Sequence, residues 1–150
     1  MTPQQYWQEV VSPTVEEYRT DPTSLRRSIL SAITIVHFAD NLIFNGINTV
    51  QGKTFAAARQ FFDLITVDCP EAGQLYSLAI VGKHMKQGSN PSPRHTIEDV
   101  FKRPPAVLGQ AVWGISRWGD EIGGVEFAKN DALRLVEATT AFLKRTFDLQ

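Results

Sequence analysis

The apolar run at residues 29–44 constrains the fold more than any other feature of this chain. It is too long for a strand, since strands in globular proteins usually have about 3–10 residues. It also contains His37, Asp40 and Asn41, and ionisable side chains are costly in a lipid bilayer. The run therefore predicts a helix over residues 25–44 that lies at the centre of a soluble bundle and does not cross a membrane.

Further helices are expected on both sides of this central one. Thr2 forms a capping box with Gln5, and Pro13 restarts or kinks the helix that follows. The spacing of apolar residues predicts helices over residues 54–66 and 68–87. A C-terminal helix begins after Asn130 or Asp131, either of which is a good N-cap.

The region between the fourth helix and the last one has a different character. Residues 88–109 are rich in proline and are expected to be irregular. Residues 111–118 carry strand-forming side chains, and we expect them to pair with residues 125–127 in a small β-hairpin. The predicted fold is therefore mainly α: a single domain, residues 1–150, built as a bundle of four or five helices with a hairpin inserted before the C-terminal helix.

Composition excludes several classes of function. The formal net charge is -1, whereas nucleic-acid binders usually carry a basic excess, so RNA binding has no support from net charge. The phosphate-binding loop, the dinucleotide-binding glycine motif and the nucleophile elbow are all absent, and we expect no cofactor. With one cysteine, Cys69, and no secretory signature at residues 1–5, the chain is expected to be cytoplasmic.

Five ionisable residues form a candidate polar pocket between helices: Arg26, His37, Asp40, Lys83 and His84. The first three share one face of the predicted central helix, and buried charges need partners. In a functional site, a histidine would carry a proton while Asp40 fixes its tautomer. We favour the other interpretation, in which His37 and Asp40 pair structurally in the core. The two histidines and Asp40 lack any recognised metal-binding spacing, so no metal site is predicted.

The predicted hairpin contains a candidate interface formed by Trp113, Arg117 and Trp118. Tryptophan and arginine are enriched among the residues that dominate binding at protein interfaces. The two tryptophans are five residues apart and would face opposite sides of a regular strand. One is then expected to pack on the bundle while the other is exposed, although packing of both against the bundle is an equal alternative.

Several segments resemble a loose group of small, mostly uncharacterised bacterial helical proteins that is similar to the HEPN superfamily. These segments are Tyr6–Val11, Arg26–Ser28, Val36–Asp40 and Gly82–His84, and the resemblance covers about half of the chain. It implies a helical bundle that often dimerises, and an RNA-cleaving or defence role. The ribonuclease members carry an R-x4-6-H motif, which is absent here, so no catalytic pair can be assigned.

Two functions are compatible with these features. The first is a non-enzymatic protein that binds an unknown protein partner, or a second copy of itself as a homodimer, through the hairpin and the proline-rich segment. The alternative is a HEPN-like RNA-acting or hydrolytic enzyme with a His/Asp/Arg pocket between helices, in a defence or toxin–antitoxin context. The two differ in whether the polar side chains converge on a water-accessible cavity.

Overall fold

The computed structural model describes residues 1–84, 86–87 and 95–150, and over these residues the chain is mainly helical, as predicted. The longer helices are α2 (Ser12–Thr20), α3 (Leu25–Phe44), α4 (Ala58–Ile65), α5 (Pro70–His84) and α6 (Ala132–Phe147), with α1 (Pro3–Tyr6) and η1 (Trp7–Val11) preceding α2. Residues 88–94, which begin the segment predicted to be irregular, lie outside the described residues.

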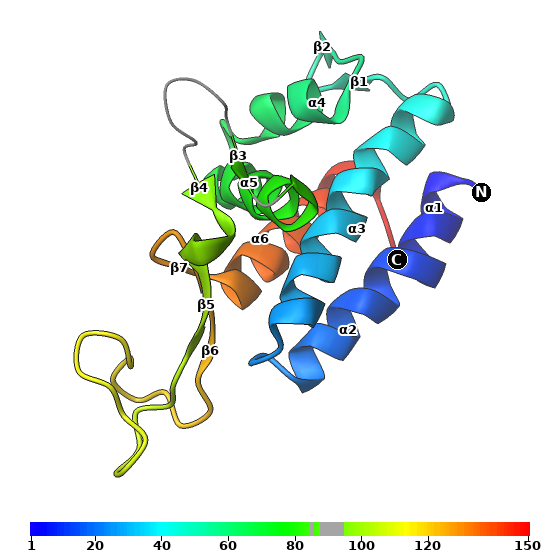
Figure 1. Cartoon of the computed structure of the whole chain (residues 1–150). Helices are drawn as coiled ribbons and strands as arrows, with labels where there is room; N and C mark the ends of the chain where they lie inside the picture. The colour runs from blue at the N-terminus through cyan, green and yellow to red at the C-terminus, as the bar shows by residue number, and fades with distance from the viewer. Residues whose placement is uncertain (85, 88–94) are drawn as a thin grey trace.

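The helices pack side by side around α3 (Figure 1). The N-terminal rod of α1, η1 and α2 runs along one side of α3, and α5 packs on another side and also contacts α6. Their buried side chains form one hydrophobic cluster that extends from Trp7 to Leu149. Edge-on aromatic contacts tie its parts together, with ring centroids 5.3 Å apart for Trp7 and Phe38 and 5.9 Å apart for Phe38 and Phe147.

Helix α3 has the length that the sequence predicts, and one face of it is buried. That face carries several small side chains, among them Ser28, Ser31, Ala32 and Ala39, which allow neighbouring helices to approach closely. On α5, Gly82 lies so near Ile29 that an added Cβ would overlap the isoleucine methyl group. By length and composition alone α3 could cross a membrane, and in this fold one face of it packs against the other helices.

Pro13 does not interrupt the N-terminal helix, contrary to the expectation of a restart. Because proline has no N–H and its ring clashes with the preceding turn, the helix widens before it into the π-helical turn η1. The N–H of Ser12 donates to the carbonyl of Trp7, five residues back, and the hydroxyl of Thr14 donates to the carbonyl of Val10 at 2.7 Å. The chain therefore remains helical from Pro3 to Thr20.

A small antiparallel sheet lies at one end of the helices. It contains β5 (Val100–Arg103), β6 (Gly124–Phe127) and β7 (Asn130–Asp131) in the order β5-β6-β7, with Arg103 opposite Gly124 and Phe127 opposite Asn130. The remaining strands are two-residue pairs: β1 (Thr49–Val50) with β2 (Lys53–Thr54), and β3 (Lys86–Gln87) with β4 (His95–Thr96), which is followed by the short turn η2 (Ile97–Asp99).

The predicted hairpin was wrong in its first strand. Residues 111–118 form turns, and the strand that pairs with β6 on that side is β5. Strand-forming side chains are not sufficient here because both edges of β6 are already occupied, and because Gly114 and Gly119 adopt left-handed φ angles of 77° and 78° that interrupt an extended chain.

Candidate functional site

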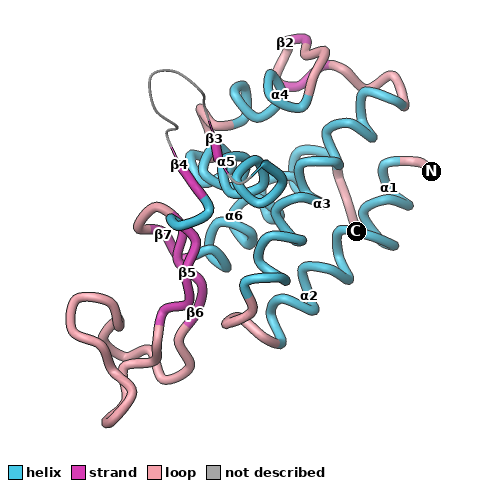
Figure 2. The backbone as a smooth tube through the Cα atoms, viewed as in Figure 1, coloured by secondary structure: helices cyan, strands magenta, loops and turns pink. Residues whose placement is uncertain are grey.

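The connection between β5 and β6, residues 104–123, is the most distinctive part of the surface, and we call it the aromatic loop. Figure 2 shows it as a long pink segment that extends from the sheet and away from the helices. Loops longer than about 12–15 residues without helix or strand are uncommon in small domains and are usually functional. Its position makes it accessible to other molecules.

The aromatic loop is organised by its own hydrogen bonds. Ser116 is the central residue: its hydroxyl accepts from the N–H of Val112 at 2.8 Å and donates to the carbonyl of Pro105 at 3.3 Å. A second turn follows, in which the N–H of Asp120 donates to the carbonyl of Arg117 at 3.1 Å. These bonds fix two successive turns, one carrying Trp113 and the other Trp118.

Both tryptophans are almost fully exposed to solvent, at 94% each. Leu108 and Ile122 are also exposed in the same loop. A groove of about 540 Å³ runs between the two turns, and its walls include Ala106, Val112 and both indoles. Large exposed apolar patches usually mark interaction sites, and this loop carries several exposed apolar side chains.

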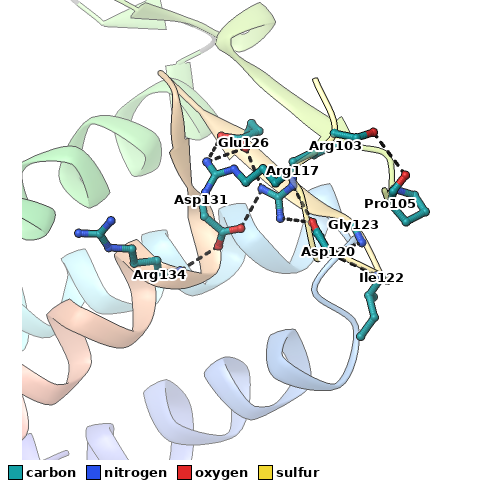
Figure 3. A network of polar contacts seen from close by, with 10 residues as sticks. Arg103, Pro105, Arg117, Asp120, Ile122, Gly123, Glu126, Asp131 and Arg134 are labelled. Carbon is teal, nitrogen blue, oxygen red and sulfur yellow. Dashed lines mark hydrogen bonds and ion pairs between the residues drawn. The ribbon is translucent and has the colours of Figure 1, made fainter. Parts of the chain in front are cut away.

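A buried arginine closes the neck of the loop (Figure 3). Arg103, at the end of β5, is 6% exposed, and its Nε and Nη2 both contact Asp120 Oδ2 at 2.8 Å. The second oxygen of Asp120 accepts from the N–H groups of Ile122 and Gly123. A Cβ at Gly123 would collide with the carbonyl oxygen of Arg103, and its φ of 84° also favours glycine. Residues at the two ends of the loop are thus held together.

The same guanidinium joins the loop to the sheet and to α6. Its Nη1 contacts Glu126 at 2.8 Å and Asp131 at 2.9 Å, and Asp131 also caps α6 by accepting from the N–H of Arg134. Arg117 adds a second contact to Glu126, with Nη2–Oε1 at 2.7 Å. Two arginines therefore face three carboxylates, which leaves one negative charge in excess.

Burial and hydrogen bonding act in opposite directions on the charges of this network. Burial alone would lower the pKa of Arg103, but hydrogen bonds to Glu126, Asp120 and Asp131 raise it above its ordinary value. Burial alone would raise the pKa of Asp120, yet its bonds with the Gly123 N–H and the Arg103 guanidinium lower it. Both pKa shifts favour the charged forms of Arg103 and Asp120, which strengthens the contact between them.

The structure places the three predicted interface residues in the aromatic loop but arranges them differently from the prediction. Neither Trp113 nor Trp118 packs on the helices, so the expectation that at least one would do so is wrong. The side chain of Arg117 is 44% exposed, and its guanidinium is directed at Glu126. The two indoles are therefore available to a partner, while Arg117 is engaged within the protein.

The five residues of the predicted polar pocket do not lie inside the protein as expected. Arg26, Asp40, Lys83 and His84 are exposed, and only His37 is half-buried. One pair among them is in contact: Lys83 Nζ lies 3.3 Å from Nε2 of His37. The predicted stripe lies opposite the buried face of α3, which carries both small side chains such as Ser28 and large ones such as Phe38. Within the described part of the chain, no group of three potential metal ligands occurs.

The Arg103 network could not be identified from the sequence. Its members come from β5, the aromatic loop, β6 and the start of α6, and no fixed spacing links them. The one available signal was a charge on each of two strands: Arg103 lies opposite Gly124 and reaches Glu126, two positions further along β6, only once the strands have paired. Comparison with protein-family models, with curated proteins and with solved structures finds no match to this chain.

Proposed function

We propose that this protein is a non-enzymatic binding protein that recognises another polypeptide chain through the aromatic loop, and that it works in the cytoplasm. The observation that carries the proposal is the exposure of both Trp113 and Trp118, at 94% each, on a loop whose neck is held by a buried ion network. Exposed indoles on a flexible tail would carry little weight, whereas here they project from ordered turns.

The free energy available from burying the two indoles is compatible with a specific interface. Two tryptophans bury on the order of 300–500 Å² when covered. At about 25 cal/mol per Å² this gives roughly 8–12 kcal/mol, which is similar to the cost of about 4–15 kcal/mol for bringing two molecules together. The indoles alone therefore support weak binding, and a tight complex also needs Leu108, Ile122 and the walls of the groove. An already ordered loop reduces the cost, because little chain freedom is lost on binding.

Charge favours a protein partner over a nucleic acid. Proteins that bind single strands combine stacking aromatics with a positively charged groove. The neck of the aromatic loop instead has an excess of carboxylates, and Glu121 adds another exposed acid beside it. An apolar surface rimmed by basic side chains is the complementary partner.

The RNA-acting or hydrolytic alternative has less support. It requires Arg26, His37, Asp40, Lys83 and His84 to meet around a cavity. Of these, His37 and Lys83 are in contact, while the other three lie exposed. The binding function therefore has the stronger support.

The first experiment asks whether the partner is a second copy of the chain. Sedimentation velocity over a wide concentration range is compared between the wild type and the double variant Trp113→Ser/Trp118→Ser. The matched control is Phe44→Ser, which removes another exposed aromatic side chain, 85% exposed and on α3. Self-association that is lost in the loop variant and retained in the control identifies a homodimer formed through the loop.

If the wild type is monomeric, the same three proteins are used as baits for capture from cell extract, and each retained protein is then purified and titrated. The proposal predicts a purified partner that binds the wild type and Phe44→Ser alike, and binds the loop variant at least about tenfold more weakly. If no self-association occurs and no purified protein distinguishes the loop variant from the control, the proposed function is wrong.

A further inference from the structure

The turn that carries Trp118 is held by an ion pair on each side. Residues 117–120 form the turn closed by the Asp120 N–H and the Arg117 carbonyl. At one end the Arg117 side chain reaches Glu126, and at the other the Asp120 side chain is held by Arg103. Trp118 lies between two ionic anchors.

The anchor at Arg117 ends on a rigid part of the molecule. Glu126 is on the central strand β6, opposite Phe101 of β5 on one side and Asp131 of β7 on the other. Its side chain is 7% exposed. The Arg117 Nη2 contacts both carboxylate oxygens, at 2.7 Å and 3.0 Å. Hydrogen bonds between charged groups are among the stronger ones, and a buried acceptor strengthens them further.

Among the residues that the structure describes, none anchors Trp113 in a comparable way. Its turn is held by the Ser116 hydroxyl and by backbone bonds from Ile115 and Ser116 to the carbonyl of Val112. These bonds lie within the loop itself and do not connect to β6. The turn of Trp113 is therefore held by bonds within the loop, whereas the turn of Trp118 is also tied to the sheet.

We infer that Arg117 is a positioning residue that holds Trp118 as the principal anchor of the binding surface, with Trp113 in a secondary role. This rests on the proposed function. Arg117 acts by binding Glu126, and the partner contacts the Trp118 indole that Arg117 positions. The sequence-based expectation of Arg117 as a contact residue is replaced by this assignment. Binding energy at interfaces is concentrated in a few well-held side chains, and a rigid tryptophan suits that role.

The inference is tested first on the protein alone, through ¹⁵N relaxation of the wild type, Arg117→Met and Arg117→Lys. Loss of Arg117 leaves Glu126 paired with Arg103, so the fold is expected to persist. In Arg117→Met the backbone order parameter of Trp118 is expected to fall from about 0.85 to below about 0.6, the values of rigid and flexible backbone. Trp113 should change little, and Arg117→Lys should retain part of the order because it keeps the charge.

The second measurement uses the purified partner, or the second copy, identified by the loop-dependence assay. Trp118→Ser should weaken binding at least about tenfold more than Trp113→Ser. Arg117→Met should weaken it about tenfold, with partial recovery in Arg117→Lys. The control is Arg134→Met, which removes another ion-paired arginine whose side chain is 74% exposed and which contacts Glu71 away from the loop.

The outcomes separate the inference from the proposed function. An unchanged order parameter at Trp118 in Arg117→Met overturns the positioning role, whatever the protein binds. Equal losses from Trp113→Ser and Trp118→Ser overturn the assignment of the anchor while the proposed function stands. If neither tryptophan affects association, the proposed function itself fails, and the assignment of an anchor fails with it.

Discussion

Replacing Arg103 with methionine should destabilise this protein more than any other single change to its polar groups. The arginine is 6% exposed and contacts three carboxylates at 2.8–2.9 Å. Methionine fills a similar space but leaves those acids without their common partner. Breaking a buried ion pair by removing one member typically costs about 3–5 kcal/mol.

The expected value lies at the lower end of that range. Asp120 and Asp131 are 18% and 21% exposed, so water can solvate them in part, and Glu126 keeps its contact with Arg117. We therefore expect a loss of about 3 kcal/mol in the free energy of unfolding. For a chain of this size, about 2–4 °C of Tm is lost per kcal/mol, which gives a decrease of roughly 6–12 °C.

The assay is urea unfolding followed by circular dichroism, with Arg134→Met as the matched control. That arginine is 74% exposed, and a surface ion pair contributes only about 0–1 kcal/mol. Hydrogen exchange adds a local readout, since the amides of Ala106, Ile122 and Gly123 all donate to Asp120 and should exchange faster in Arg103→Met. If Arg103→Met unfolds within about 0.5 kcal/mol of the control, the network does not stabilise the fold and the reasoning is refuted.

Three further predictions concern acid, packing and the exposed indoles. Because the pKa of Asp120 is lowered on folding, its carboxylate contributes to the free energy of unfolding above its ordinary pKa of about 3.9, and this contribution is lost as pH falls through the lower folded value. Asp120→Asn should therefore flatten the acid part of a curve of stability against pH measured by urea unfolding. Gly82→Ala should cost about 1–3 kcal/mol through overlap with Ile29, and a thermal-unfolding double-mutant cycle should show that Ile29→Ala relieves it. Trp113→Ser and Trp118→Ser should each leave the free energy of unfolding within about 0.5 kcal/mol of the wild type; a larger loss would mean that the indoles support the fold.

The helices were largely predictable because their signals are local. The capping box of Thr2 and Gln5 is formed, Asp131 caps α6, and α3 covers the expected residues. Boundaries were less accurate: α4 begins after Ala57 and not at Thr54, and α5 ends at His84, before the expected Gln87. Signals of this kind act over one helical turn, and tertiary contacts decide where the last turn is kept.

The candidate site on α3 could not be predicted correctly because the helix is apolar on most sides. With bulky residues such as Ile29, Leu30 and Ile33 on one face, that face looked like the interior. The protein fully buries the opposite face, where Ser28 and Ala39 let neighbouring helices approach. Of the three bulky residues, Ile29 and Ile33 pack partly against the core and Leu30 is 38% exposed. Which face is buried depends on the shapes of the partner helices, and a single helix does not encode those.

The aromatic loop, too, could be predicted only in part from the sequence. Its tryptophans were singled out as interface candidates because their residue type alone suggests that role, which stays a prediction. Their presentation depends on Arg103 and on its partners Asp120 and Glu126, which lie 17 and 23 positions after it along the chain. Pairing over such distances becomes visible only when the strands that carry it have met.

The closed neck has a consequence for how this protein could change over time. Because Arg103 and Asp120 tie the two ends of the loop together, the stretch between them is joined to the sheet at this neck and through the contact of Arg117 with Glu126. Substitutions or insertions within residues 106–116 would alter what is recognised without disturbing the helices, so long as the two end residues and Arg117 are kept. The scaffold could thus acquire new specificities by exchanging that stretch, and a laboratory library randomised there would draw on the same tolerance.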